Sequence, residues 1–181
     1  MEYEIPIPIK HVLIGVASRH GSTEGIADVL AETLEKEGIE VHIFKPDEIT
    51  SVEGYDAAII GSAVYGGDWL DEAKSLVRRH AIDLRHMPVY LFSSGPIGSP
   101  AFPKLHRSVH IEPLLHVCKA REHQVFMGAI SGEHLSRFER LMAKLVHVPA
   151  GDYRDWGDIV AWARHLAEEI HALPSPVPLR Y

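Results

Sequence analysis

Residues 18–23 form a short segment rich in hydroxyl side chains, between an apolar run at 12–17 and an amphipathic helix pattern. Gly21 permits a turn at which a Cβ would clash, and the first N–H groups of the helix favour an anion. The segment has no lysine and fits neither G-x-G-x-x-G nor G-x-x-x-x-G-K-[ST], so we expect a single phosphate here. An ordinary turn with a Ser or Thr N-cap is the alternative. The residues expected to bind the phosphate are Ser18, Arg19, His20, Gly21, Ser22 and Thr23.

Two later segments combine small and aromatic residues, and each follows an apolar run, at 57–61 and at 89–92. Small residues let the backbone approach a flat heterocycle and hydrogen-bond to its polar edge. Tyr65 and Trp69 could stack on the face of such a ring, or they could belong to the core. The residues expected to contact the ring are Ser62, Ala63, Val64, Tyr65, Gly66, Trp69, Ser94, Gly95, Pro96, Ile97 and Gly98.

Strand and helix patterns alternate along the chain, and this order must position the three segments. The alternation favours right-handed crossovers and an α/β fold, with a doubly wound five-stranded parallel sheet and helices on both faces. In a sheet with strand order 2-1-3-4-5, ligands bind beyond the carboxyl ends of the strands, between strands one and three. The expected strands are 12–17, 40–44, 57–61, 89–92 and 124–130, and the expected helices are 23–36, 70–80 and 156–173.

Composition limits the class of protein. With 181 residues, 46% of them hydrophobic, the chain is long enough for one core and short for two domains. A net charge of -7 argues against nucleic acid as a partner, and no apolar run reaches the ~18 residues that span a bilayer. The first eight residues hold too short an apolar segment for a signal peptide, and the lone Cys118 is expected to fill a buried apolar site. We therefore expect a soluble cytoplasmic protein.

The motifs after the first and third strands resemble those of the flavodoxin superfamily, and the resemblance extends over residues 11–173. Ala17–Thr23 is similar to the Ser-x-Arg-x-Gly-x-Thr loop of the menaquinone-dependent protoporphyrinogen dehydrogenase branch, with Ala17 in place of the first Ser. Tyr55-Asp56 and the run Ile59–Gly66 resemble that branch's Tyr-Asp, Ile-Gly and Tyr-Gly pattern. The resemblance implies a flavodoxin-like sheet with strand order 2-1-3-4-5.

Of two other stretches, one resembles that branch and the other departs from it. Phe138–Leu145 followed by Asp155-Trp156 resembles its late insertion and the start of its last helix. This implies a single flavodoxin-like domain over residues 1–181 with a helical insertion around 132–152. Ser93–Pro100 departs from the branch, which leaves the substrate open.

The resemblance implies bound FMN, with its phosphate on residues 18–23 and its ring between the two later segments. It also implies an oxidoreductase that passes electrons from a substrate, such as a protoporphyrinogen-like compound, to a quinone or similar acceptor. Two alternatives stay open: a flavodoxin-type electron carrier with no substrate of its own, and a protein that binds a deazaflavin in the same cleft. The partner is then a redox protein or a quinone, and the oligomeric state is open.

Residues 133–148 predict an amphipathic helix with a basic side. Its apolar residues share one face, and Arg137, Arg140 and Lys144 lie on the rest. Such a helix can dock on an anionic membrane or partner, or it can pack on the core with its charges outward. Because a pure carrier does not need this segment, we expect an FMN enzyme that contacts the inner face of the membrane peripherally.

Overall fold

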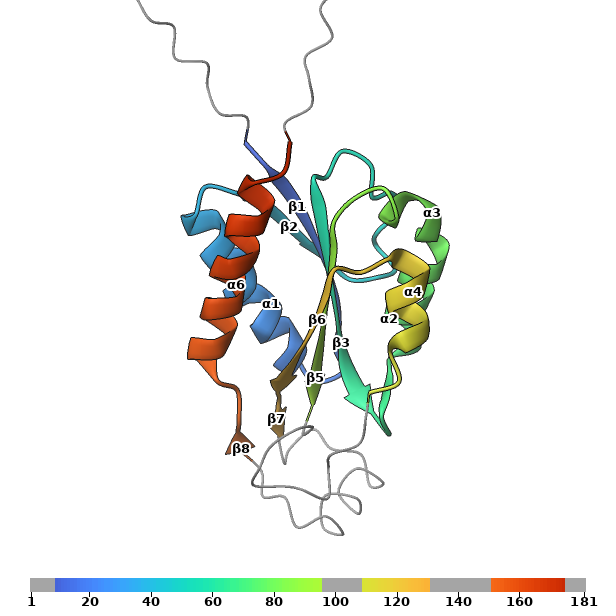
Figure 1. The fold of residues 1–181 in the computed structure, drawn as a ribbon. Helices are drawn as coiled ribbons and strands as arrows, with labels where there is room; N and C mark the ends of the chain where they lie inside the picture. Colours follow the sequence, from blue (N-terminus) through green and yellow to red (C-terminus); the bar gives the residue numbers. More distant parts are fainter. Residues whose placement is uncertain (1–8, 96–108, 131–150, 175–181) are drawn as a thin grey trace, which may run out of the picture.

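The computed structural model describes residues 9–95, 109–130 and 151–174, which form a layered α/β fold (Figure 1). The strands of the main sheet are β1 (His11–Ala17), β2 (Glu40–Phe44), β3 (Ala57–Tyr65), β5 (Val89–Gly95) and β6 (Glu122–Met127). The helices are α1 (Ser22–Lys36), α2 (Asp71–Arg79), α3 (Ala81–Leu84), α4 (Glu112–Cys118) and α6 (Trp156–His171). The strand order is β2-β1-β3-β5-β6, and all neighbours are parallel.

Short antiparallel strands extend this framework at the carboxyl end of the sheet. β4 (Asp68–Trp69) pairs with the end of β3. β7 (Ala129–Ile130) follows β6 and pairs with β8 (Gly151–Asp152), which precedes α6. The two β7–β8 strands therefore bracket residues 131–150 and hold both ends of that segment at one place.

The central strands are buried on both faces because their sequences are almost wholly apolar. Successive side chains of a strand point to opposite faces, so each central strand contributes side chains to two hydrophobic cores, one on each face of the sheet. Ile14, Ile59 and Phe92 pack with residues of α1 and α6, whereas Leu13 and Leu91 pack with residues of α2, α3 and α4. Figure 1 shows these two helical layers on either side of the sheet.

α1 carries the loop at its start because its apolar residues recur at helical spacing. Ile26, Leu30 and Leu34 are fully buried against the sheet. The helix ends at Lys36 with Glu37 as its C-cap, and Gly38 follows with a φ of 81°, the left-handed conformation that commonly stops a helix. This packing fixes α1 with its N-terminus at the carboxyl end of β1.

The predicted fold class and strand order are confirmed. β4 pairs with β3 in a hairpin and lies off the path of the main sheet, so the order β2-β1-β3-β5-β6 corresponds to the expected 2-1-3-4-5. Some boundaries were wrong. β3 continues to Tyr65 and β5 to Gly95, so six of the expected loop residues lie on strands: Ser62, Ala63, Val64, Tyr65, Ser94 and Gly95. The expected strand 124–130 is two strands, because the chain leaves the sheet after Met127 to pair with β8.

Other expectations have mixed outcomes. Cys118 is fully buried in the core, as expected, but α3 and α4 were not predicted. The helix expected at 133–148 and the expected ring contacts Pro96, Ile97 and Gly98 lie outside the described residues, as does most of the expected insertion at 132–152. Among the described helices, none combines the length and the apolarity that crossing a bilayer requires.

Candidate functional site

The loop between β1 and α1 is built around a left-handed glycine. Gly21 has φ 78° and ψ -10°, and its N–H donates to Ser18 Oγ at 3.0 Å. Gly21 is also the N-cap residue, and in the described part of the chain no side chain caps α1. The alternative of a Ser or Thr N-cap is therefore wrong. The first-turn N–H groups of α1 lie at the positive end of the helix dipole, an arrangement that favours an anion.

The hydroxyl groups of this loop differ in their surroundings. Ser22 Oγ accepts a hydrogen bond from the N–H of Ala129 at 2.7 Å, which leaves the hydroxyl proton of Ser22 to donate to a ligand. Thr23 is 1% exposed and so lies inside the fold. Arg19 and His20 are both exposed. The loop thus combines the hydroxyl groups of Ser18 and Ser22 with backbone donors and a cationic side chain.

Tyr65 brings the first and second predicted loops together. It is half-buried at the end of β3, and the guanidinium carbon of Arg19 lies 4.7 Å from the centre of its ring. The turn beyond it is made by Gly66 and Gly67, whose φ angles are 63° and 89°. Since these angles suit a two-residue hairpin, the chain returns along β4 directly beside Tyr65.

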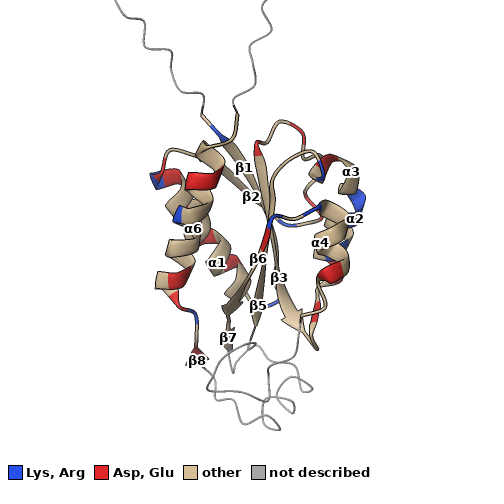
Figure 2. Cartoon of the chain, in the orientation of Figure 1, with Lys and Arg blue, Asp and Glu red and all other residues tan. Residues whose placement is uncertain are grey.

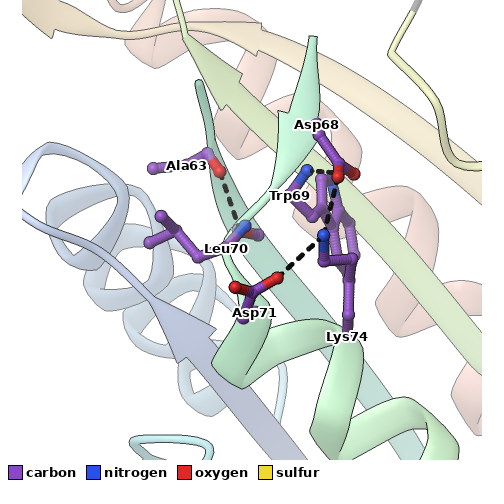
Figure 3. A network of polar contacts seen from close by, with 7 residues as sticks. Ala63, Asp68, Trp69, Leu70, Asp71 and Lys74 are labelled. Atoms are coloured by element: carbon purple, nitrogen blue, oxygen red, sulfur yellow. Dashed lines mark hydrogen bonds and ion pairs between the residues drawn. The ribbon is translucent and has the colours of Figure 1, made fainter. Parts of the chain in front are cut away.

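A polar network fixes the base of this hairpin (Figure 3). Lys74 Nζ lies 2.6 Å from Asp68 Oδ2 and 2.9 Å from Asp71 Oδ1, which joins β4 to the first turn of α2. Hydrogen bonding to Lys74 lowers the pKa of Asp68, and the two carboxylates raise the pKa of Lys74. The buried Ser62 hydroxyl accepts from the N–H of Leu70 at 3.0 Å and donates to the carbonyl of Ala63 at 2.8 Å. The Ser62 hydroxyl is therefore already used within the fold.

Trp69 lies in the core rather than on the surface of the hairpin. It is 3% exposed, and its indole N–H donates to Ser93 Oγ at 2.7 Å. The same Ser93 oxygen lies 2.8 Å from Nε2 of His123 on β6. Burial lowers the pKa of His123, which favours the neutral form of its ring. An indole so enclosed has little face to offer a ligand, so the structure favours the core role for Trp69.

The end of β5 supplies the remaining described residues of the predicted ring site. Ser94 is buried, and the carbonyl of Gly95 accepts from the N–H of Gly128 at 3.0 Å. Ser94 follows Ser93 on the strand that is in register with β3, where Ala63 is its partner. The ends of β3 and β5 therefore lie side by side, next to the first loop.

Sequence reasoning missed the residues that approach this loop from late in the chain. Ala129 contacts Ser22 across 107 positions, and Arg154 Nη1 lies 3.3 Å from the carbonyl oxygen of Ser22 across 132 positions. No local pattern predicts contacts of such separation, because they depend on how β7 and β8 pair. The ends of the segment 131–150 are thereby held next to the predicted phosphate loop.

A separate cavity of about 250 Å³ lies between the first turns of α1 and the end of β2. None of the predicted site residues lines it. Its carboxylates, Glu24, Asp28 and Glu48, disfavour an anion, and Lys45 is the one cation in its lining. In the described residues no group of three or more His, Cys, Asp or Glu side chains could hold a metal ion.

Comparisons with known proteins bear on this geometry. A relative from Escherichia coli strain K12, protoporphyrinogen IX dehydrogenase (quinone), is 25% identical over 169 residues, which cover 86% of this chain and 93% of the relative. Flavodoxin 1 from Bacillus cereus superposes with a TM-score of 0.60 at 18% identity, over 88% of this chain and 98% of its own. The FMN-bound flavodoxin of Fusobacterium nucleatum gives 0.54 at 15% identity, over 89% and 99%.

A fourth similarity covers only part of a larger protein. The rubredoxin oxygen:oxidoreductase of Desulfovibrio gigas has a TM-score of 0.58 at 17% identity, and the match covers 91% of this chain but 37% of that chain. Because these structural neighbours are less than 25% identical to this chain, they show its fold alone. The family model described as "Flavodoxin domain" matches residues 13–156, which is most of the chain. The chain therefore belongs to the flavodoxin domain family.

Proposed function

We propose that this chain is an FMN-dependent oxidoreductase that takes electrons from an organic substrate and passes them to a quinone or a similar acceptor. The observation that carries the proposal is the β7–β8 pairing, which holds both ends of residues 131–150 beside the loop 18–23. A simple electron carrier has no need of a second segment at this position. The similarity to the Escherichia coli relative, a protoporphyrinogen IX dehydrogenase (quinone), supports the same choice.

FMN fits the residues at the carboxyl end of the sheet. Its phosphate would bind at the uncapped start of α1, where Gly21 opens the turn and the Ser22 hydroxyl proton is available. Its ring would lie between the ends of β3 and β5, with Tyr65 at the edge. When bound, FMN supplies electron transfer in one- or two-electron steps. The family match and the FMN-bound neighbour support this cofactor.

The chain's own residues would bind and orient the cofactor. The loop holds the phosphate through backbone N–H groups and hydroxyls, without the point charge of a lysine. The Lys74 network and the Ser62 hydroxyl keep the hairpin that carries Tyr65 in one place. The buried carboxyl ends of β3 and β5 exclude water from one side of the ring. Residues 1–181 act in this proposal as one domain with a late insertion.

The insertion is the proposed substrate- or membrane-contacting part. Arg137, Arg140 and Lys144 lie within residues 131–150 in a protein whose net charge is -7. Cationic side chains beside apolar ones suit a carboxylate-bearing tetrapyrrole or an anionic lipid surface. The proposal predicts that these charges matter for turnover and not for folding.

The test starts with the absorbance spectrum of the purified protein and the mass of the released ligand, which separate FMN from a deazaflavin. Quinone-coupled turnover and co-sedimentation with anionic vesicles are then measured for the variant R137Q/R140Q/K144Q. The variant R78Q/R85Q/R164Q removes three exposed cations from the described helices and their connections, so it controls for charge alone. We expect only the first variant to lose turnover or vesicle binding, and more so at low salt. Equal behaviour of the two variants would favour the electron carrier.

A further inference from the structure

We propose that Arg154 is a positioning residue for the phosphate of FMN: it acts on Ser22 from outside the loop and does not touch the ligand. This inference rests on the proposed function, because it names how one residue late in the chain supports the same site. It assigns a role to a side chain that belongs to none of the three predicted segments.

The guanidinium group of Arg154 is fixed in one orientation. Nε and Nη2 donate to the two carboxylate oxygens of Asp152 at 2.8 and 2.6 Å, a bidentate pair. Its guanidinium carbon lies 4.3 Å from the centre of the Trp156 ring, and the side chain is only 17% exposed. Hydrogen bonding to Arg154 lowers the pKa of Asp152, so the pair stays ionised at neutral pH. An arginine held on two sides loses little entropy on making a further contact.

The remaining nitrogen of this fork reaches the first residue of α1. Nη1 donates to the carbonyl oxygen of Ser22 at 3.3 Å, while the N–H of Ala129 donates to Ser22 Oγ at 2.7 Å. Ser22 is therefore held at its backbone by Arg154, two residues after β8, and at its side chain by Ala129 of β7. Because Oγ accepts from Ala129, its proton is free to point away from that contact, toward a phosphate oxygen.

Gly25 provides the space that this contact requires. A Cβ built at Gly25 would lie 2.6 Å from Arg154 Nη1, closer than a real contact permits. Glycine weakens a helix interior relative to alanine, yet it stands here in the first full turn of α1. Glycine at position 25 therefore lowers the stability of α1 at the point where the Arg154 guanidinium lies against the helix. A charge neutralised by Asp152 is poorly suited to bind phosphate directly, so the role is positional.

The test compares FMN with riboflavin, which lacks the phosphate, in the full-length protein. The variants are R154M and G25A, and R164M on the exposed side of α6 is the matched control. We expect R154M and G25A to weaken FMN binding roughly three- to tenfold, the range for one lost hydrogen bond, and to leave riboflavin affinity unchanged. R164M should match the wild type for both ligands. G25A should melt at or above the wild-type temperature, because alanine favours the helix.

A second variant keeps the proposal testable if R154M folds poorly. D152N removes the carboxylate that orients Arg154, and it should give the same selective loss of FMN affinity. The losses of FMN affinity in the single variants R154M and S22A should not add in the double variant R154M/S22A, since both substitutions act through one contact to the phosphate. Wild-type FMN affinity in R154M, or an equal loss of FMN and riboflavin, would overturn this inference alone. A wild-type protein that binds no FMN would overturn the proposed function together with it.

Discussion

At the scale of single residues, two aromatic side chains of one hairpin have separate roles. Tyr65 ends β3 half-buried and contacts Arg19 of the first loop, whereas Trp69 is enclosed and donates to Ser93. Their types and their spacing in the sequence are compatible with stacking for both. The difference arises from strand parity in β4, which turns the indole inward.

Tyr65→Ala should weaken FMN binding several-fold, because ring stacking is worth about 0.5–1.5 kcal/mol beyond burial. Tyr65→Phe keeps the aromatic face and should retain most of the affinity. Trp69→Phe removes the donor to Ser93, so it should lower the free energy of unfolding by about 1–3 kcal/mol while FMN affinity stays near the wild-type value. Fluorescence titration and urea unfolding check these three variants. Unchanged affinity in Tyr65→Ala would exclude this residue from the ring site.

His123 makes the stability of the fold depend on pH in one direction. Its ring contacts Ser93 Oγ and feels the charge of Glu112, but burial dominates and lowers its pKa below the usual 6.5. Between the lowered pKa and 6.5 the unfolded chain binds more protons than the folded one, so the free energy of unfolding should rise with pH and level off above about 6.5.

Urea unfolding from pH 5 to 8 measures this dependence. His123→Gln should flatten the curve in that window, while His116→Gln, at an exposed position on α4, should leave the wild-type slope in place. If His123→Gln kept the full slope, the pH dependence would arise from other groups.

At the scale of elements, the sequence predicted what depends on local patterns. Fully buried strands read as continuous apolar runs, and α1 and α6 have clear helical periodicity, so their places were predictable. The pair Gly66-Gly67 is a two-residue hairpin signal that would have revealed β4. α4 was missed because a seven-residue helix with Leu114 and Cys118 as its buried residues carries too short a pattern. The contact of Arg154 with Ser22 depends on long-range pairing and has no local signal.

The two left-handed glycines at the ends of α1 offer a matched pair of variants. Gly21 and Gly38 have φ angles of 78° and 81°, and a Cβ at either position would meet no atom within 4 Å. Gly21→Val and Gly38→Val should therefore each cost a similar amount of stability, about 1–2 kcal/mol of backbone strain. Only Gly21→Val distorts the predicted phosphate loop, so it alone should release FMN. Retention of FMN at wild-type affinity in Gly21→Val would place the phosphate elsewhere.

At the scale of the whole molecule, acidic and basic residues occur together both on the scaffold and within residues 131–150. Acidic and basic residues both occur on the helices on either side of the sheet, as the red and blue segments of Figure 2 show. Such a mixture presents no extended surface of one charge sign on these helices. The segment between β7 and β8 contains Arg137, Arg140 and Lys144 together with Glu133 and Glu139. The flavodoxin-like scaffold thus holds the residues on either side of this segment beside the loop 18–23.

The most direct measurement of the proposed function is the reductive half-reaction of the FMN-loaded protein. The protein is mixed without oxygen with a protoporphyrinogen-type tetrapyrrole, and the flavin absorbance is followed before and after a soluble naphthoquinone is added. We predict that the tetrapyrrole bleaches the flavin band and that the quinone restores it, since an oxidoreductase accepts electrons from its own substrate. A flavin that stays oxidised with the tetrapyrrole, yet is reduced by a protein reductant, would contradict the account and identify an electron carrier.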